Sequence, residues 1–246
     1  MKEKTYPCAL TIAGSDSSGG GGIQGGLKTF AALEVHGASV ITAITAQNTV
    51  GVHDVIPVPP DFVKRQLEVV MEDMTINAAK TGMLYSSEII DVVSKILGEK
   101  DLPVVVDPVM FSKSGYPLLR EDAIDTFIKK MIPLATVITP NVPEAERLTG
   151  IRIKTIEDSE EAAKALVKMG AKAAVVKGGH LKKDSAVDVL YYDGSFKYYV
   201  SERIETPNSH GTGCVFSAAI AAALAKGRSI PEAVRIAKDL ITVALK

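Results

Sequence analysis

Hydrophobic residues along this chain occur in short runs, and the spacing within each run predicts a strand or a helix. Runs rich in β-branched residues, with no polar alternation, are typical of strands buried on both faces of a sheet. Such runs predict strands at residues 7–13, 39–46, 78–81, 104–107, 137–139 and 173–177. Between them, apolar residues at helical spacing predict amphipathic helices. These helices are expected at residues 23–33, 60–74, 87–97, 121–131, 159–169, 215–225 and 231–244.

The order of these segments predicts an α/β fold. Strands that alternate with helices form a mostly parallel central sheet with helices on both faces, which is a three-layer α/β/α sandwich. Late in the chain, Asp193-Gly194 separates two strand-like segments, residues 187–192 and 196–200, and this pattern predicts an antiparallel hairpin. Because the composition shows no linker and no abrupt change, we expect residues 1–246 to form a single domain.

Composition and charge exclude several classes of partner. Lysine and arginine total 28 against 29 acidic residues, with no basic run, so neither nucleic acid nor a membrane surface is expected as a partner. The longest apolar run, residues 215–225, is too short to span a bilayer. Two cysteines, Cys8 and Cys214, do not make a disulfide framework or a four-cysteine metal site. These features favour a cytoplasmic protein.

Polar and glycine-rich residues collect where the expected strands end. They occupy residues 14–22, 47–48, 80–82, 107–108, 140–141 and 177–179. In open parallel sheets, ligands bind beyond the carboxyl ends of the strands. The repetition of this pattern predicts a small-molecule site at that edge of the sheet.

The segment from His210 to Cys214 carries the most specific candidate chemistry. Gly211, Thr212 and Gly213 form a turn directly before an expected helix, where unpaired N–H groups and the helix dipole favour an anion. That arrangement suits a phosphoryl group that gains charge during transfer. Cys214 could act there as nucleophile or proton acceptor, and the absence of a Cys-His-Asn pattern favours the general base. The alternative is a glycine-permitted turn packed by a small cysteine.

Four polar residues at other strand ends and helix starts have two interpretations each. Asn141 and Glu144 lie three positions apart, where they could hold hydrated Mg²⁺ or form a capping box. Asp107 ends a strand and could be a further partner of the metal or of a phosphate, or it could cap the following segment. Lys177 could reach a nucleotide phosphate or extend into solvent.

Common glycine-rich nucleotide motifs do not explain the chain. Residues 20–25 read G-x-G-x-x-G, but the second strand ends at Gln47 and not at the acid that would bind a ribose. The P-loop pattern G-x-x-x-x-G-K-[ST] does not occur. Any nucleotide is therefore expected to be held in another way.

Seven motifs, taken in order, resemble the hydroxymethylpyrimidine/phosphomethylpyrimidine kinases of thiamine biosynthesis, within the ribokinase-like superfamily. They are residues 13–20, 46–49, 80–84, 107–110, 139–146, 176–180 and 210–214. The resemblance covers nearly the whole chain and implies a ribokinase-like α/β/α sandwich. It also implies transfer of the γ-phosphoryl group of ATP, with Mg²⁺, to 4-amino-5-hydroxymethyl-2-methylpyrimidine and then to its monophosphate.

Matched residue by residue, the resemblance implies a role for each candidate. Catalysis would involve Cys214 and an anion hole formed by Gly211, Thr212 and Gly213. The substrate pocket would contain Gly14, Gln47, Met83, Val109 and His210. The nucleotide would contact Asn141, Lys177 and Thr212, and the metal site would contain Asp107, Asn141 and Glu144. The resemblance further implies a homodimer.

One position departs from the family's pattern. Where the family reads G-I-Q-A-D-L-K-T, residues 22–29 of this chain have Gly26 in place of the aspartate that contacts the pyrimidine in family members. Loss of a buried acceptor could weaken binding of the pyrimidine by about 1–3 kcal/mol. Two alternatives therefore stay open: a vitamin B6 kinase of the same superfamily, and a ligand sensor without catalysis. The intact candidate residues around Cys214 argue against the sensor.

Overall fold

An eight-stranded sheet forms the centre of the computed structural model, which describes residues 6–112, 114–178, 185–206 and 209–246. Across the sheet, the strand order is β10-β9-β8-β7-β6-β5-β1-β2. The pairs from β2 to β8 are parallel, whereas β9 pairs antiparallel with both β8 and β10. The strands are β1 (Cys8–Ala13), β2 (His36–Ile41), β5 (Ala78–Thr81), β6 (Val104–Val106), β7 (Val137–Ile138), β8 (Ala173–Gly178), β9 (Ser185–Tyr192) and β10 (Ser195–Glu202).

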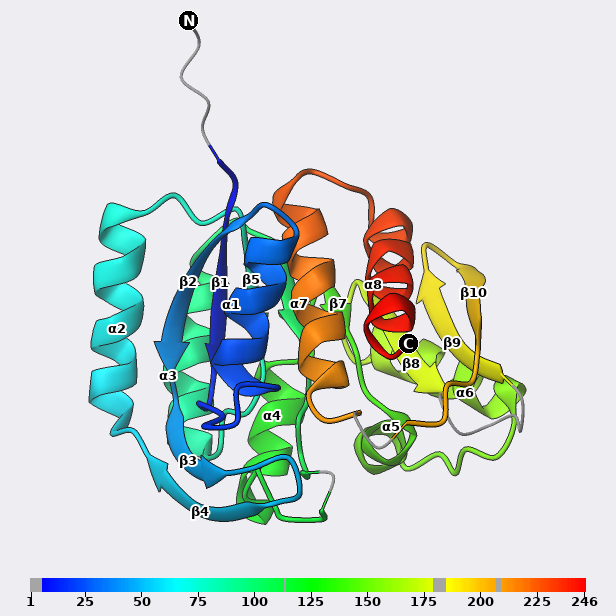
Figure 1. Cartoon of the computed structure of the whole chain (residues 1–246), viewed down its shortest axis with the longest axis horizontal. Helices are drawn as coiled ribbons and strands as arrows, with labels where there is room; N and C mark the ends of the chain where they lie inside the picture. The colour runs from blue at the N-terminus through cyan, green and yellow to red at the C-terminus, as the bar shows by residue number, and fades with distance from the viewer. Residues whose placement is uncertain (1–5, 113, 179–184, 207–208) are drawn as a thin grey trace, which may run out of the picture.

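Helices cover both faces of this sheet, which gives three layers (Figure 1). One face carries α1 (Gly22–Ala32), α7 (Thr212–Ala225) and α8 (Ile230–Ala244). The other carries α2 (Pro60–Asp73), α3 (Ser87–Gly98), α4 (Ile124–Lys130), which follows a short 3₁₀ turn at Glu121–Ala123, α5 (Val142–Thr149) and α6 (Ile156–Lys168). A separate hydrophobic cluster fills each interface between helices and sheet. The structure therefore confirms the α/β/α sandwich with a mostly parallel central sheet.

Helix α7 is buried on nearly all sides. Residues 216–224 are all buried, because α7 packs between α1 and α8 and lies against β1, β5 and β6. A helix that is apolar all round is expected in such a position. The packing holds the first turn of α7 at the carboxyl edge of the sheet.

The segment expected as one strand, residues 39–46, is two strands in two sheets. β2 ends at Ile41, whereas β3 (Ala43–Gln47) pairs antiparallel with β4 (Val52–Pro57) in a separate two-stranded sheet. Between them, the N–H of Thr42 donates to the carbonyl oxygen of Ala13, and its hydroxyl donates to that of Met83. These bonds redirect the chain at the sheet's edge, so the prediction of a continuous strand is wrong. The sequence analysis also missed β4, because most of its side chains are exposed.

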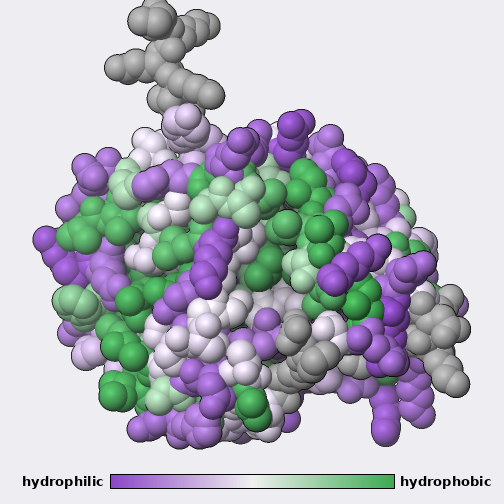
Figure 2. Space-filling model, in the orientation of Figure 1, coloured by the Kyte–Doolittle hydropathy of each residue, from purple (hydrophilic) through white to green (hydrophobic). Residues whose placement is uncertain are grey.

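Figure 2 shows the face that carries α1, α7 and α8, where hydrophobic and hydrophilic residues are interspersed. The exposed large hydrophobic residues include Phe62 on α2, Tyr198 on β10 and Val243 on α8, and of these elements β10 and α8 pack against each other. None of the helices in the described ranges combines the length and apolar character that crossing a bilayer requires.

Candidate active site

A cavity of about 870 Å³ opens at the carboxyl ends of the parallel strands. This is the edge at which the sequence predicts a ligand site. The expected site residues all line it: Gly14, Gln47, Met83, Asp107, Val109, Asn141, Glu144, Lys177, His210, Gly211, Thr212, Gly213 and Cys214. The structure brings these residues together on one surface, and the role of each stays a prediction.

The turn before α7 forms one wall of the cavity. Gly211 has a φ of 82°, a left-handed conformation that glycine adopts without strain. A Cβ at this position would overlap the carbonyl oxygen of Gly20, so the loop after β1 packs directly against the turn. Cys214, a half-buried free thiol, lies in the first turn of the helix. Because the first N–H groups of a helix have no acceptor within it, this wall presents hydrogen-bond donors and the positive end of a helix dipole.

Asp16, which the sequence analysis did not single out, links the loop after β1 to this turn. Its Oδ2 lies 2.6 Å from Nε2 of His210 and accepts a 2.6 Å hydrogen bond from the N–H of Gly21. Its Oδ1 accepts from both the N–H and the hydroxyl of Ser18. Burial raises the pKa of Asp16, but the hydrogen bonds from Ser18, His210 and Gly21 outweigh burial, so the pKa lies below its ordinary value. The sequence did offer one indication that Asp16 belongs to the site, because it lies within the first family motif, residues 13–20.

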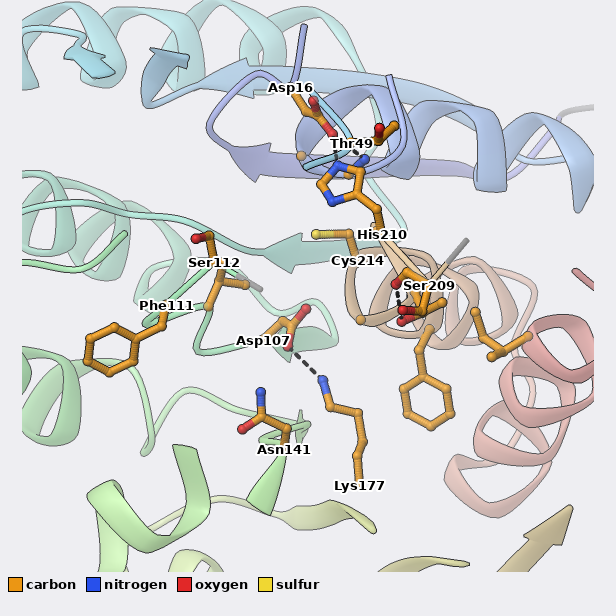
Figure 3. Close-up of a pocket in the computed structure, with 18 of the residues that line it drawn as sticks. Asp16, Thr49, Asp107, Phe111, Ser112, Asn141, Lys177, Ser209, His210 and Cys214 are labelled. Carbon is orange, nitrogen blue, oxygen red and sulfur yellow. Dashed lines mark hydrogen bonds and ion pairs between the residues drawn. The ribbon is translucent and has the colours of Figure 1, made fainter. Parts of the chain in front are cut away.

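Asp107 and Lys177 form an ion pair on the other side of Cys214 from Asp16 (Figure 3). Nζ of Lys177 lies 3.2 Å from Oδ1 of Asp107. Asp107 also accepts hydrogen bonds from the hydroxyls of Thr139 and Ser217, at 3.3 and 3.0 Å. Burial lowers the pKa of Lys177, but the nearby carboxylates, Asp107 first, raise it by more, so the ammonium form is favoured. With 17% of its side chain exposed, Lys177 lies in the cavity wall and does not extend into bulk solvent.

Asn141 and Glu144 form the capping box that was the alternative to a metal site. The side chain of Asn141 accepts from the N–H of Glu144, and Oε2 of Glu144 accepts from the N–H of Asn141, both at 2.9 Å. Oε1 of Glu144 accepts a 3.3 Å hydrogen bond from the N–H of Met110. Burial raises the pKa of Glu144; Lys177 opposes this effect and Asp107 adds to it, leaving the pKa raised. Both capping residues still line the cavity.

A magnesium ion would find few direct protein ligands in this part of the cavity. The described residues contain no group of three or more His, Cys, Asp or Glu side chains suited to a metal. The oxygens of Asp107 and Glu144 already accept hydrogen bonds from protein groups. This arrangement fits hydrated Mg²⁺, which keeps several waters and binds through one or two carboxylates together with substrate phosphates.

The end of the cavity near Asp16 combines apolar surface with a few polar groups. Met83 lies so close to Gly14 that a Cβ there would be 2.9 Å from its sulfur. Val109 has a φ of 44°, which is unfavourable for a β-branched residue and is imposed by its surroundings. Nε2 of Gln47 lies 3.4 Å from Nε2 of His210. Such a mixture is typical of a site for a small organic molecule.

Gly26, the position that departs from the family's pattern, is not among the described residues that line the cavity. A Cβ on Gly26 would lie 2.9 Å from the hydroxyl oxygen of Thr11, between α1 and the sheet. The replacement of the family's aspartate by Gly26 therefore alters the packing between α1 and the sheet.

A further buried ion pair, Asp188 with Lys238, lines the cavity away from Asp16. Nζ of Lys238 lies 3.0 Å from Oδ2 of Asp188 and donates to the carbonyl oxygen of Ala186 at 3.1 Å. Oδ1 of Asp188 accepts from the N–H of Gly178. The sequence analysis missed this pair, although an aspartate inside a hydrophobic strand was a signal that it needs a buried partner.

Solved structures of other proteins share this fold. The crystal structure of phosphomethylpyrimidine kinase from Clostridium difficile 630 is 47% identical, with a TM-score of 0.87, and the match covers 98% of this chain and 100% of that one. An ADP complex of Bacillus subtilis pyridoxal kinase is 43% identical, with a TM-score of 0.89, over 98% of this chain and 92% of that one. The sandwich is therefore a ribokinase-like kinase fold, as the sequence resemblance implied.

The sequence comparison identifies the family within this class. Residues 16–246 match the family described as phosphomethylpyrimidine kinase. The hydroxymethylpyrimidine/phosphomethylpyrimidine kinase of Haemophilus influenzae is 51% identical over 241 residues, which cover 96% of this chain and 90% of the relative. The chain belongs to the phosphomethylpyrimidine kinase family and is a phosphotransferase.

Proposed function

We propose that the chain transfers the γ-phosphoryl group of ATP to the hydroxymethyl group of 4-amino-5-hydroxymethyl-2-methylpyrimidine, and then phosphorylates the resulting monophosphate. The observation that carries this proposal is the position of Cys214 in one cavity, between the His210–Asp16 pair and the Asp107–Lys177 pair (Figure 3). The names of the relatives support this choice of substrate. The proposal also includes a cytoplasmic location and a homodimeric state for the enzyme.

In the proposed reaction, Cys214 accepts the proton of the substrate hydroxyl while the oxygen attacks the γ-phosphorus. The new O–P bond forms as the bond to the β,γ-bridging oxygen breaks, and ADP leaves with that electron pair. Negative charge on the transferred group is stabilised by the donors of the turn that contains Gly211, Thr212 and Gly213. Positioning and electrostatics supply most of the rate enhancement in such a reaction.

The nucleotide phosphates are placed beside the Asp107–Lys177 pair. Lys177 supplies a cation to the phosphates, and Asn141 and Thr212 supply polar contacts. Asp107, Asn141 and Glu144 would hold Mg²⁺ through its waters. When bound, the metal neutralises phosphate charge.

The pyrimidine is placed at the other end, near Asp16. Gly14, Met83 and Val109 supply apolar contacts there, while Gln47 and His210 supply polar ones. Because Gly14 carries no Cβ, the side chain of Met83 packs closely against its backbone.

A vitamin B6 kinase is the second candidate function. The 43% identity to Bacillus subtilis pyridoxal kinase favours it, and pyridoxal also presents a hydroxymethyl group on a heteroaromatic ring. A sensor without catalysis has Gly26 as its only support.

The deciding experiment is a product assay with purified protein, ATP and Mg²⁺, with the pyrimidine, its monophosphate or pyridoxal as acceptor. We expect the monophosphate and then the diphosphate of the pyrimidine, with a kcat/KM above that for pyridoxal. A higher kcat/KM for pyridoxal would favour the B6 kinase. The absence of product with all three acceptors would contradict both kinase proposals.

A further inference from the structure

Lys177, the lysine proposed to bind the nucleotide phosphates, lies between two buried aspartates. On one side, its Nζ is 3.2 Å from Oδ1 of Asp107, which follows β6. On the other side, Asp188 of β9 is its direct partner in the antiparallel pairing of β8 with β9. Residues paired in this way share one face of the sheet, with Cβ atoms about 4.5–5.5 Å apart. The carboxylate of Asp188 is therefore also within the reach of a lysine side chain at position 177.

Lys238 of α8 occupies the carboxylate that Lys177 could otherwise use. Its Nζ lies 3.0 Å from Oδ2 of Asp188 and donates to the carbonyl oxygen of Ala186 at 3.1 Å. The other carboxylate oxygen, Oδ1, accepts a 3.1 Å hydrogen bond from the N–H of Gly178. The side chains of Asp188 and Lys238 are only 8% and 11% exposed, so salt screens their attraction weakly. Both oxygens of Asp188 are thus engaged, and its charge is neutralised from α8.

The four charged side chains form two separate ion pairs in the wall of one cavity. Lys177 pairs with Asp107, and Lys238 pairs with Asp188, so each ammonium group has one carboxylate. Without the charge of Lys238, two buried carboxylates and one ammonium would remain. A buried carboxylate that has lost its cation is strongly unfavourable. Asp107 and Asp188 would therefore compete for Lys177.

We propose that Lys238 is a positioning residue for nucleotide binding, which neutralises Asp188 and thereby keeps the ammonium group of Lys177 beside Asp107. This inference rests on the proposed function, in which Lys177 supplies a cation to the nucleotide phosphates. Lys238 acts through Asp188 and Lys177, and its effect does not depend on a contact between Lys238 and the nucleotide. Helix α8 thus contributes to ATP affinity by deciding which of two carboxylates Lys177 can pair with.

ATP affinity, measured by calorimetry with Mg²⁺ and without an acceptor, tests the proposal. The Lys238→Met variant should bind ATP about 10- to 100-fold more weakly, which corresponds to the loss of one hydrogen bond to a charged group. Adding Asp188→Asn removes the competing charge but keeps an acceptor for the N–H of Gly178. The double variant should therefore recover most of the affinity. A double variant that binds ATP as weakly as Lys238→Met would overturn the proposal, because Lys238 would then act on the nucleotide directly.

Lys238→Gln is a milder variant that serves if Lys238→Met does not fold. Glutamine can still donate a hydrogen bond to Asp188 but carries no charge, so ATP affinity should fall by a smaller factor than in Lys238→Met. Wild-type affinity in Lys238→Gln would overturn the proposal. Lys226→Met is the control, because Lys226 pairs with the largely exposed Glu34, and it should keep wild-type affinity. An equal loss in Lys226→Met would contradict a specific role for Lys238.

The position of Lys177 in crystals tests the same inference without nucleotide and without catalysis. In Lys238→Met crystals, Nζ of Lys177 should lie within ion-pair distance of Asp188 and no longer beside Asp107. In crystals of the double variant with Asp188→Asn, it should pair with Asp107 again. A Lys177 that stays beside Asp107 in Lys238→Met would overturn the proposal. If the wild type forms no product with any acceptor, the proposed function fails, whereas the position of Lys177 still decides this inference.

Discussion

Asp16 and His210 lie 194 positions apart in the sequence, yet their side chains meet at 2.6 Å between the loop after β1 and the turn before α7. The same carboxylate oxygen accepts from the N–H of Gly21, so one atom holds both segments. Cys214 lies one helical turn beyond His210. The pair therefore fixes the position of the proposed base relative to the substrate end of the cavity.

Replacing Asp16 with asparagine should disturb this link. An amide has one acceptor oxygen and cannot reproduce the hydrogen bonds from Ser18, Gly21 and His210 together. We expect the free energy of unfolding to fall by about 1–3 kcal/mol, and kcat to fall while ATP affinity stays unchanged. Denaturant unfolding measures the stability, steady-state kinetics measure kcat, and calorimetry measures ATP affinity. Asp54→Asn, at an exposed position of β4, is the control and should change none of these quantities.

The stability of the protein should depend on the ionisation of Asp16 in acid. Its folded-state pKa lies below the ordinary value of about 3.9. A lowered carboxyl pKa contributes stability that is fully present above the unfolded-state pKa and is lost as the pH falls through the folded-state pKa. The difference in unfolding free energy between wild type and Asp16→Asn should stay constant near neutral pH and narrow below about pH 4. If the difference in unfolding free energy does not depend on pH, the ionisation of Asp16 does not contribute to unfolding in acid.

Gly211 and Gly227 offer a matched test of the contact between the two loops. Both have positive φ, 82° and 75°, but a Cβ on Gly211 would overlap the carbonyl oxygen of Gly20, whereas one on Gly227 meets nothing within 4 Å. Alanine at either position costs about 1–2 kcal/mol for the left-handed backbone. We expect Gly211→Ala to lower the free energy of unfolding by more than Gly227→Ala does, and to abolish turnover. The Gly227→Ala variant should remain active. Equal losses of stability and activity would show that the loop contact is unimportant.

Cys214→Ala tests the proposed base. General-base catalysis contributes about 10²–10⁴-fold to a rate, so kcat should fall within this range while ATP binding is retained. Steady-state kinetics and calorimetry separate these quantities. Cys8→Ala removes the buried thiol of β1, outside the cavity, and should keep kcat. A Cys214→Ala enzyme with normal kcat would exclude the cysteine from proton transfer.

Lys238→Met should leave the carboxylate of Asp188 buried without its cation. Breaking a buried pair by removing one partner costs about 3–5 kcal/mol, and chemical denaturation measures this loss. In the double variant with Asp188→Leu, part of the stability should return, because no charge remains unpaired. Lys226→Met, whose partner Glu34 is largely exposed, should cost little. A loss as small as that of Lys226→Met would show that the buried pair contributes nothing.

The sequence predicts those parts of the fold that depend on local spacing. Strand and helix order follow from hydrophobic periodicity, and the hairpin at Asp193-Gly194 follows from its turn residues. The division at Thr42 does not follow, because it depends on carbonyl groups of Ala13 and Met83 that are distant in the chain. The exposed strand β4 carries no hydrophobic run that a pattern could identify.

The candidate site could also be predicted only in part from the sequence. Residues at strand ends could be predicted, since the carboxyl ends of parallel strands share one edge of the sheet. Asp16 and Asp188 could not be assigned, because each is explained by a partner that only the folded chain supplies, His210 and Lys238. Asn141 and Glu144 form the capping box, whereas their role in holding Mg²⁺ stays a prediction, and spacing alone could not separate the two interpretations.

The position of α7 and α8 in the chain has a consequence for biosynthesis. Both helices follow all eight strands of the sheet described above, and with α1 they cover one of its hydrophobic faces. A nascent chain on the ribosome therefore holds a sheet with one face largely bare until these helices emerge. The wall of the cavity that contains Cys214 is completed by the same event. The covering of this hydrophobic face and the completion of that cavity wall therefore coincide, at a late stage of translation.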